Sequence, residues 1–247
     1  MIDTRKEINN HKTILMVPGA IAPAFGPLWE YFYKIPSYLK DKYNFDIHVV
    51  ELPTWGNIFK RSRLIEEYID TNLAGKNFHI IGHSKGGPEV RYLLEQGNIN
   101  SQVLSFTSIS CPYQGSTVAT LFYYLFFPLK IFSRNFIESL KELRPGVYDQ
   151  YWKKDYLEYS FPCFYAASDI PAPVVFNTYP LFWLTYPILK YFEGKNDGFV
   201  SIKSASFGKC LEICQTDHIG MIGQFYGKTG KFEYFKIYDL IISSILK

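Results

Sequence analysis

Apolar runs alternate with amphipathic stretches along most of the 247-residue chain. Runs of β-branched and apolar residues that end in turn residues predict strands at 13–17, 46–51, 78–81, 103–110, 161–167 and 209–214. Helices are predicted at 29–40, 61–73, 88–96 and 234–246, most clearly at 61–73, where apolar residues recur every three or four positions. Pro36 is expected to kink the first helix. Because strands alternate with helices, we expect an α/β fold whose mostly parallel sheet carries helices on both faces.

The alternation stops twice. Residues 115–159 form an aromatic stretch followed by an amphipathic segment at 135–143, and residues 170–194 are rich in proline. No internal repeat or low-complexity linker marks a domain boundary. We therefore expect a single domain over residues 1–247, with a helical, aromatic lid inserted at about 115–160.

Composition limits the classes of function. Aromatic residues make up 18% of the chain, and this surplus indicates apolar ligands or contact with a membrane surface. The formal net charge of +3 is too small to indicate nucleic-acid binding, which usually needs clustered basic residues. Four cysteines are too few for a disulfide scaffold, and we expect all four to be reduced. Their spacing indicates no zinc site.

The first apolar run, at 14–17, stops at Pro18-Gly19 and is too short for a signal peptide. The longer uncharged stretches are interrupted by polar residues or prolines, which argues against a membrane-spanning helix. We expect a soluble protein, cytoplasmic or exported without a cleavable signal peptide, for which peripheral membrane contact stays open.

A serine lies between a predicted strand and a predicted helix, in Gly82-His83-Ser84-Lys85-Gly86. This context is typical of a nucleophile elbow, a strained turn that exposes a serine at the N-terminus of a helix. Residues two before and two after the serine pack so closely that only small side chains fit. The helix amides there favour developing negative charge. We therefore expect Ser84 to be a catalytic nucleophile.

A serine hydroxyl needs a base to take its proton, and the chain has five histidines. Four are excluded because they precede the first strand, lie within strands or belong to the elbow: His11, His48, His79 and His83. In the chain order typical of such an elbow, the serine comes first and the histidine last. His218, in the loop after the last predicted strand, satisfies this order and is the expected base.

The acid should lie between the serine and the histidine. Asp197, in a turn 21 residues before His218, is the favoured candidate. Asp169 is a rival because it follows the strand predicted at 161–167, a common place for the acid. Asp217 is adjacent to the base and would point away from it. From the residues alone, Asp197 and Asp169 both stay open.

Six motifs occur in one order along most of the chain. They are Pro18-Gly19 after the first strand; Tyr31-Phe32-Tyr33-Lys34-Ile35-Pro36; Gly82-His83-Ser84-Lys85-Gly86-Gly87-Pro88 with Arg91-Tyr92; Ser110-Cys111-Pro112-Tyr113-Gln114-Gly115-Ser116; Asn196-Asp197-Gly198-Phe199-Val200; and Asp217-His218-Ile219. Together they resemble the true-lipase group of α/β hydrolases, the family of the small Proteus and Pseudomonas/Burkholderia lipases. The resemblance implies the α/β-hydrolase fold.

The resemblance also implies roles for single residues. It makes Asp197 the triad acid, and it makes the backbone N–H groups of Ala20 and Lys85 the oxyanion hole. The Lys85 side chain would then be free, and we expect it to be solvated.

Three departures from the family change the expectations. Pro18-Gly19 stands where the family has His-Gly, so the loop after the first strand needs another brace. Residues 115–160, which would set substrate choice, match poorly. Gly220 replaces a calcium-binding aspartate, so no metal is expected.

The sequence thus predicts a serine carboxylic-ester hydrolase, a lipase or esterase, that acts on lipid acyl esters through a Ser-His-Asp triad and an acyl-enzyme. No cofactor is expected, and the partner is a lipid or small acyl ester. Three alternatives stay open. An acyltransferase or a phospholipase would use the same triad, and a catalytically silent lipid-binding protein would keep only the fold.

Overall fold

The computed structural model describes residues 12–20, 30–129, 132–225 and 232–247. Within these residues, six strands form one sheet in the order β2-β1-β3-β4-β5-β6, and every neighbouring pair is parallel. The strands are β1 (Thr13–Val17), β2 (Asp46–Val49), β3 (Phe78–His83), β4 (Val103–Ile109), β5 (Cys163–Ser168) and β6 (Lys209–Cys214). All six predicted strands are confirmed, with ends that differ by a few residues.

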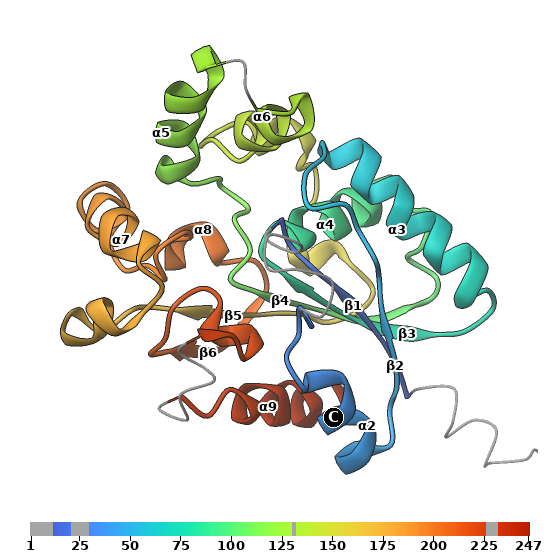
Figure 1. Cartoon of the computed structure of the whole chain (residues 1–247). Coiled ribbons are helices and arrows are strands. Elements are labelled where there is room, and N and C mark those ends of the chain that lie inside the picture. The colour runs from blue at the N-terminus through green and yellow to red at the C-terminus, as the bar shows by residue number, and fades with distance from the viewer. Residues whose placement is uncertain (1–11, 21–29, 130–131, 226–231) are drawn as a thin grey trace, which may run out of the picture.

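Helices cover both faces of the sheet, as predicted. Helices α2 (Ile35–Tyr43) and α9 (Phe235–Ile245) lie on one face, and α3 (Ile58–Asn72) and α4 (Gly86–Gln96) lie on the other (Figure 1). The alternation of β1 explains this layering. Ile14 and Met16 pack into the core beneath α2 and α9, whereas Leu15 and Val17 pack into the core beneath α3 and α4.

The first helix differs from the expectation. Its predicted range was 29–40, but α2 begins at Ile35, after Lys34 in a left-handed conformation with φ of 56°. Pro36 lies in the first turn of α2, where its missing N–H costs nothing. Pro36 therefore starts this helix and does not kink it. Residue 29 lies outside the described residues.

Helices α5 (Thr117–Phe126), α6 (Arg134–Glu142) and α7 (Leu181–Phe192) lie beyond the carboxyl ends of the strands (Figure 1). Helix α7 forms within the proline-rich stretch, with Pro187 in its interior. Its side chains Phe182, Tyr186 and Leu189 are buried, and this packing outweighs the cost of the proline. The short elements are η2 (Phe127–Leu129), η3 (Tyr148–Tyr151), η4 (Tyr156–Glu158), η5 (Ala172–Asn177), α8 (Ile202–Ala205) and η6 (Gly220–Ile222).

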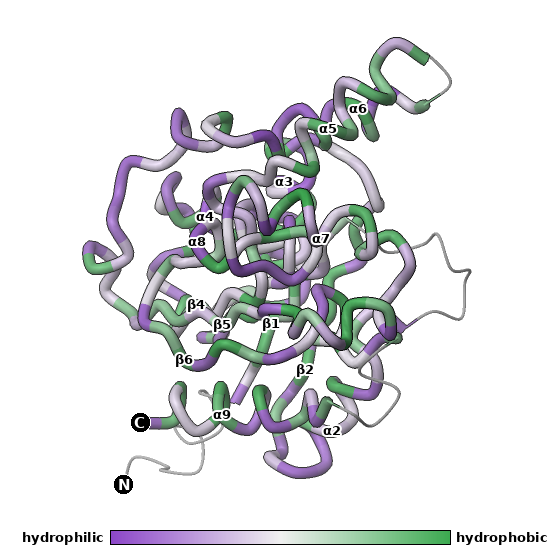
Figure 2. Tube along the Cα trace, turned by 90° about the vertical axis from the view of Figure 1, so that its left-hand side faces the viewer, coloured by the Kyte–Doolittle hydropathy of each residue, from purple (hydrophilic) through white to green (hydrophobic). Residues whose placement is uncertain are grey.

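The region predicted as a lid contains two unlike halves. Helix α5 shows green, hydrophobic residues between pale ones (Figure 2), and Tyr124 and Leu125 of α5 and Phe127 of η2 are largely exposed. The second half is fixed to the domain, because Tyr148 is fully buried and the Arg91 guanidinium lies 4.4 Å from the Trp152 ring centroid. None of the helices in the described ranges is long and apolar enough to cross a membrane.

Candidate active site

Ser84 lies at the turn between β3 and α4 with φ of 54°, a left-handed conformation that serine rarely adopts. The neighbouring glycines make this turn sterically possible. A Cβ on Gly82 would lie 3.1 Å from the Gly87 Cα, and a Cβ on Gly86 would lie 2.6 Å from the Val17 carbonyl oxygen. The predicted need for small residues on both sides of Ser84 is confirmed.

The structure brings Ser84, His218 and Asp197 into one chain of hydrogen bonds. His218 Nδ1 lies 2.9 Å from Asp197 Oδ2, and His218 Nε2 lies 2.9 Å from Ser84 Oγ. A carboxylate can only accept, so Nδ1 carries the proton and Nε2 is free to accept from the serine hydroxyl. His218 and Asp197 are buried, whereas Ser84 is partly exposed. A substrate can thus reach the Ser84 hydroxyl, whereas His218 and Asp197 are shielded from solvent.

The turn of Asp197 prearranges its carboxylate. Oδ1 accepts hydrogen bonds from the backbone N–H groups of Phe199 at 3.0 Å and Val200 at 2.8 Å. Oδ2, which faces His218, also accepts from the Ser168 hydroxyl at 3.4 Å. Gly198 has φ of 96°, and a Cβ there would lie 2.5 Å from the Phe182 ring. Hydrogen bonds to both oxygens therefore hold the Asp197 carboxyl group in place.

The other two acid candidates have different partners. Asp169 accepts the Asn196 backbone N–H at 3.0 Å, so it supports the turn that carries Asp197. Asp217 accepts the Gly220 N–H at 2.6 Å and closes the loop after His218. Burial raises the pKa of Asp217 to about 7.

His83 supports the backbone of His218, which the sequence did not predict. His83 Nε2 lies 3.1 Å from the His218 carbonyl oxygen, and His83 Nδ1 lies 2.7 Å from the Tyr31 hydroxyl. A carbonyl only accepts, so Nε2 donates and Nδ1 accepts from Tyr31. The Tyr31 oxygen in turn accepts the Gly19 N–H at 2.8 Å. Burial holds the pKa of His83 well below its usual range, so this imidazole is neutral.

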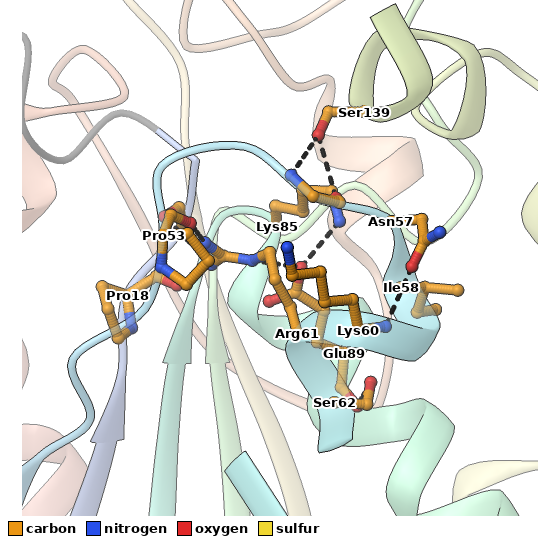
Figure 3. A network of polar contacts seen from close by, with 12 residues as sticks. Pro18, Pro53, Asn57, Ile58, Lys60, Arg61, Ser62, Lys85, Glu89 and Ser139 are labelled. Carbon is orange, nitrogen blue, oxygen red and sulfur yellow. Dashed lines mark hydrogen bonds and ion pairs between the residues drawn. The ribbon is translucent and has the colours of Figure 1, made fainter. Parts of the chain in front are cut away.

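The expectation that the Lys85 side chain is free was wrong. It is fully buried, and its ammonium lies 2.6 Å from Glu89 Oε1 (Figure 3). Glu142 Oε2 lies 3.5 Å from the same ammonium. The helical i,i+4 spacing of Lys85 and Glu89 is the signal that could have predicted this pair. Ala20 is buried next to Gly19, in the loop after β1.

Nothing in the described ranges gathers three or more His, Cys, Asp or Glu side chains that could hold a metal. Gly220 is packed in its loop, since a Cβ there would lie 2.2 Å from Thr216 Oγ1. Gln224, which matches a neighbouring ligand position of the resembled family, turns its amide N–H groups to the backbone oxygens of Glu30 and Tyr31. Of the four cysteines, all unbonded, Cys210 is the exposed one.

These elements define a class of fold: a parallel sheet with a serine at the elbow after β3, an acid after β5 and a histidine after β6. No family model matches the sequence, and no curated protein matches it. Solved structures do. A metagenomic carboxyl esterase superposes with a TM-score of 0.77 and 16% identity, over 94% of this chain and 75% of that one.

Two further solved structures are similar. The mature lipase of Bacillus licheniformis has a TM-score of 0.67 and 19% identity, over 85% of this chain and 86% of its own. A phospholipase of Legionella pneumophila has a TM-score of 0.58 and 14% identity, over 79% and 45%. The chain therefore has the α/β-hydrolase fold, as predicted. The narrower resemblance to the true-lipase group stays a prediction.

Proposed function

We propose that this protein is a serine hydrolase that cleaves carboxylic esters of lipids through Ser84, His218 and Asp197. One observation carries the proposal. The serine of a strained elbow, an imidazole and a buried carboxyl group form an unbroken hydrogen-bonded chain, with 2.9 Å at each step. The fold is shared with proteins described as an esterase, a lipase and a phospholipase, which supports the same class of reaction here.

In the first half of the reaction, Ser84 Oγ attacks the ester carbonyl carbon while its proton passes to His218 Nε2. Asp197 stabilises the imidazolium that forms and keeps its ring oriented. The tetrahedral intermediate collapses, the ester C–O bond breaks, and His218 returns the proton to the leaving alcohol. Water then attacks the acyl-enzyme with the same base and releases the carboxylic acid.

The negative oxygen of the tetrahedral intermediate needs donors that are in place before the reaction. The backbone N–H groups of Ala20 and Lys85 are our candidates. Gly19 supports this placement, because a Cβ on it would lie 3.0 Å from Ser84 Oγ, so the loop after β1 passes directly beside the nucleophile. Lys85 follows the nucleophile in the chain and precedes α4.

Exposed aromatic and aliphatic side chains support lipid acyl esters as the substrate class. They lie on α5, η2 and α7, and include Leu125, Phe127, Trp183 and Leu184. Exposed apolar side chains that gather on neighbouring elements are typical of contact with lipid or detergent. An acyltransferase or a phospholipase would use the same triad. The first would differ in the acceptor of the acyl group, and the second in the ester that is attacked.

A fluorophosphonate probe tests the proposal directly, because it bonds only to an activated serine. We expect stoichiometric labelling of the wild type and none of Ser84→Ala. A p-nitrophenyl ester series of increasing chain length then gives the acyl preference, and an added alcohol acceptor separates hydrolysis from acyl transfer. An unlabelled wild type that still binds lipid vesicles would instead identify the catalytically silent lipid-binding protein.

A further inference from the structure

Glu89 lies in α4, one turn after the elbow, and its carboxylate is fully buried. A single oxygen, Oε1, accepts from Arg61 Nε at 2.6 Å and from Lys85 Nζ at 2.6 Å. Figure 3 shows the three side chains converging between the loop after β1, α3 and the start of α4. Burying two basic side chains against one carboxylate is costly, because each charge loses its hydration. The arrangement therefore indicates a role besides stability.

The Arg61 end of this cluster holds the loop after β1. Arg61 Nη2 donates to the Pro18 carbonyl oxygen at 2.8 Å and to the Gly19 carbonyl oxygen at 3.1 Å. In a trans peptide the carbonyl and the following N–H point in opposite directions. Because Arg61 fixes the Gly19 carbonyl, it also fixes the direction of the Ala20 N–H, which points away from the guanidinium.

The Lys85 end holds the other donor. The Lys85 backbone N–H is the second candidate of the oxyanion site, and its side chain is tied to Glu89 one helical turn later. Glu142 at the end of α6 adds a contact of 3.5 Å to the Lys85 ammonium and accepts the Ile58 N–H at 2.9 Å. The cluster thus joins two basic and two acidic side chains.

We propose that Glu89 is a positioning residue of the oxyanion site. Through Arg61 and Lys85, its carboxylate holds the peptide units that present the Ala20 and Lys85 N–H groups. This inference rests on the proposed function. Glu89 touches no reacting atom, and it acts by fixing two donors whose placement decides how well a negative oxygen is stabilised.

The test is Glu89→Gln, which keeps the shape of the side chain and removes its charge. With p-nitrophenyl butyrate, and with active sites counted by the fluorophosphonate, we expect kcat to fall about 10- to 100-fold. KM should stay within about twofold, because the ester in its ground state carries no full negative charge. A trifluoromethyl ketone forms a reversible hemiketal oxyanion on Ser84, so its affinity should fall by the same factor as kcat.

The matched control is Glu95→Gln. Glu95 lies on the same helix, its side chain is buried, and it pairs with Arg91 at 3.6 Å, away from the elbow. Glu95→Gln should lower the melting temperature without changing kcat per titrated site or the ketone affinity. Lys85→Met, which keeps the backbone N–H, gives a second variant in case Glu89→Gln does not fold, and it should lower kcat about 10-fold.

Two outcomes are distinct. If the wild type is labelled, but Glu89→Gln and Lys85→Met match Glu95→Gln in kcat and ketone affinity, the cluster only stabilises the fold and the inference is wrong. If the wild type is neither labelled nor active on esters, the proposed function fails first, and the positioning role fails with it.

Discussion

Tyr31 and His83, 52 positions apart, share a buried hydrogen bond of 2.7 Å that joins the two halves of the candidate active site. On one side, His83 donates to the backbone carbonyl of His218. On the other, the Tyr31 oxygen accepts the Gly19 N–H next to the proposed oxyanion donor. The resembled family has a histidine where this chain has Pro18. Here the Tyr31 hydroxyl holds the loop after β1 through its hydrogen bond with the Gly19 N–H.

Tyr31→Phe should therefore reduce activity without touching the triad. The change removes one hydroxyl and leaves the Gly19 N–H and His83 Nδ1 without their partner, which should cost about 1–3 kcal/mol of unfolding free energy. We expect kcat to fall about 10-fold with KM nearly unchanged. Tyr38→Phe is the control, because that hydroxyl donates to Asp239 at 2.6 Å and joins α2 to α9, across the sheet from α5 (Figure 1). Equal kcat values for the two variants would refute the bracing role.

The triad should behave as one unit. Ser84→Ala and His218→Ala should each lower kcat on a p-nitrophenyl ester by about 10⁴- to 10⁶-fold, and the double variant should be little worse than either. Asp197→Asn should cost about 10⁴-fold, because the imidazole loses the partner that fixes its tautomer.

Asp169→Asn is the control for the acid. Its side chain accepts the Asn196 N–H, so we expect a loss of stability and only a small change in kcat. An Asp169→Asn variant far less active than Asp197→Asn would reverse the assignment of the acid.

Much of the sheet and the elbow could be predicted because their signals are local. Strand β1 is a short apolar run and β2 alternates polar and apolar residues, and both patterns are typical of strands. Ser84 is marked by the glycines around it, where a larger side chain would clash. The partners of buried charges could not be predicted in the same way. Arg61 meets Glu89 only after α3 and α4 pack, and nothing around Arg61 in the sequence shows that it will be buried. Helix α7 was missed for a similar reason, because tertiary packing overrode its proline.

The stability of the protein should carry a pH-dependent contribution from Asp217. Burial raises its pKa from 3.8 to about 7 in the folded state. Between these values the folded protein holds the proton more tightly than the unfolded chain, so this contribution is complete below pH 3.8 and is lost as the pH rises through 7. The contribution to the free energy of unfolding is at most about 4 kcal/mol. Urea unfolding of the wild type and Asp217→Asn at pH 5 and pH 8 gives the difference.

Asp239→Asn provides the control for that experiment. Desolvation raises the pKa of Asp239, but hydrogen bonds from Tyr38, Lys42 and Tyr43 outweigh it and leave the pKa lowered. Its contribution therefore has the opposite sign: it is lost only as the pH falls below 3.8, so wild type and Asp239→Asn should differ equally at pH 5 and pH 8. If wild type and Asp217→Asn differ equally at pH 5 and pH 8, Asp217 does not titrate in this range.

We predict that the protein needs no calcium. Gly220 provides no side-chain oxygen at the position where the resembled family has a carboxylate, and Gln224 turns its amide N–H groups to backbone oxygens. A calcium ion usually takes about six to eight oxygen ligands, with carboxylates among them. Excess EDTA should leave both activity and melting temperature unchanged. A melting temperature that falls with EDTA and recovers only with Ca²⁺ would show a calcium site that the sequence did not predict.

Helix α5 and η2 should form the part of the 115–160 region that meets lipid. Their outer side chains are exposed, whereas Tyr148 and Trp152 fix the later part of the region to the domain. We expect the rate to rise as an ester substrate passes from monomers to micelles, since exposed aromatic surface is stabilised by lipid. Phe127→Ser should weaken this rise and leave hydrolysis of monomeric p-nitrophenyl butyrate within about twofold, because removing one apolar contact weakens lipid binding without touching the triad. The control is Leu246→Ser, which removes a similarly exposed side chain at the end of α9, across the sheet from α5 (Figure 1). A rate that follows one hyperbola through the micellar transition, together with no binding to vesicles, would contradict the lipid-facing role.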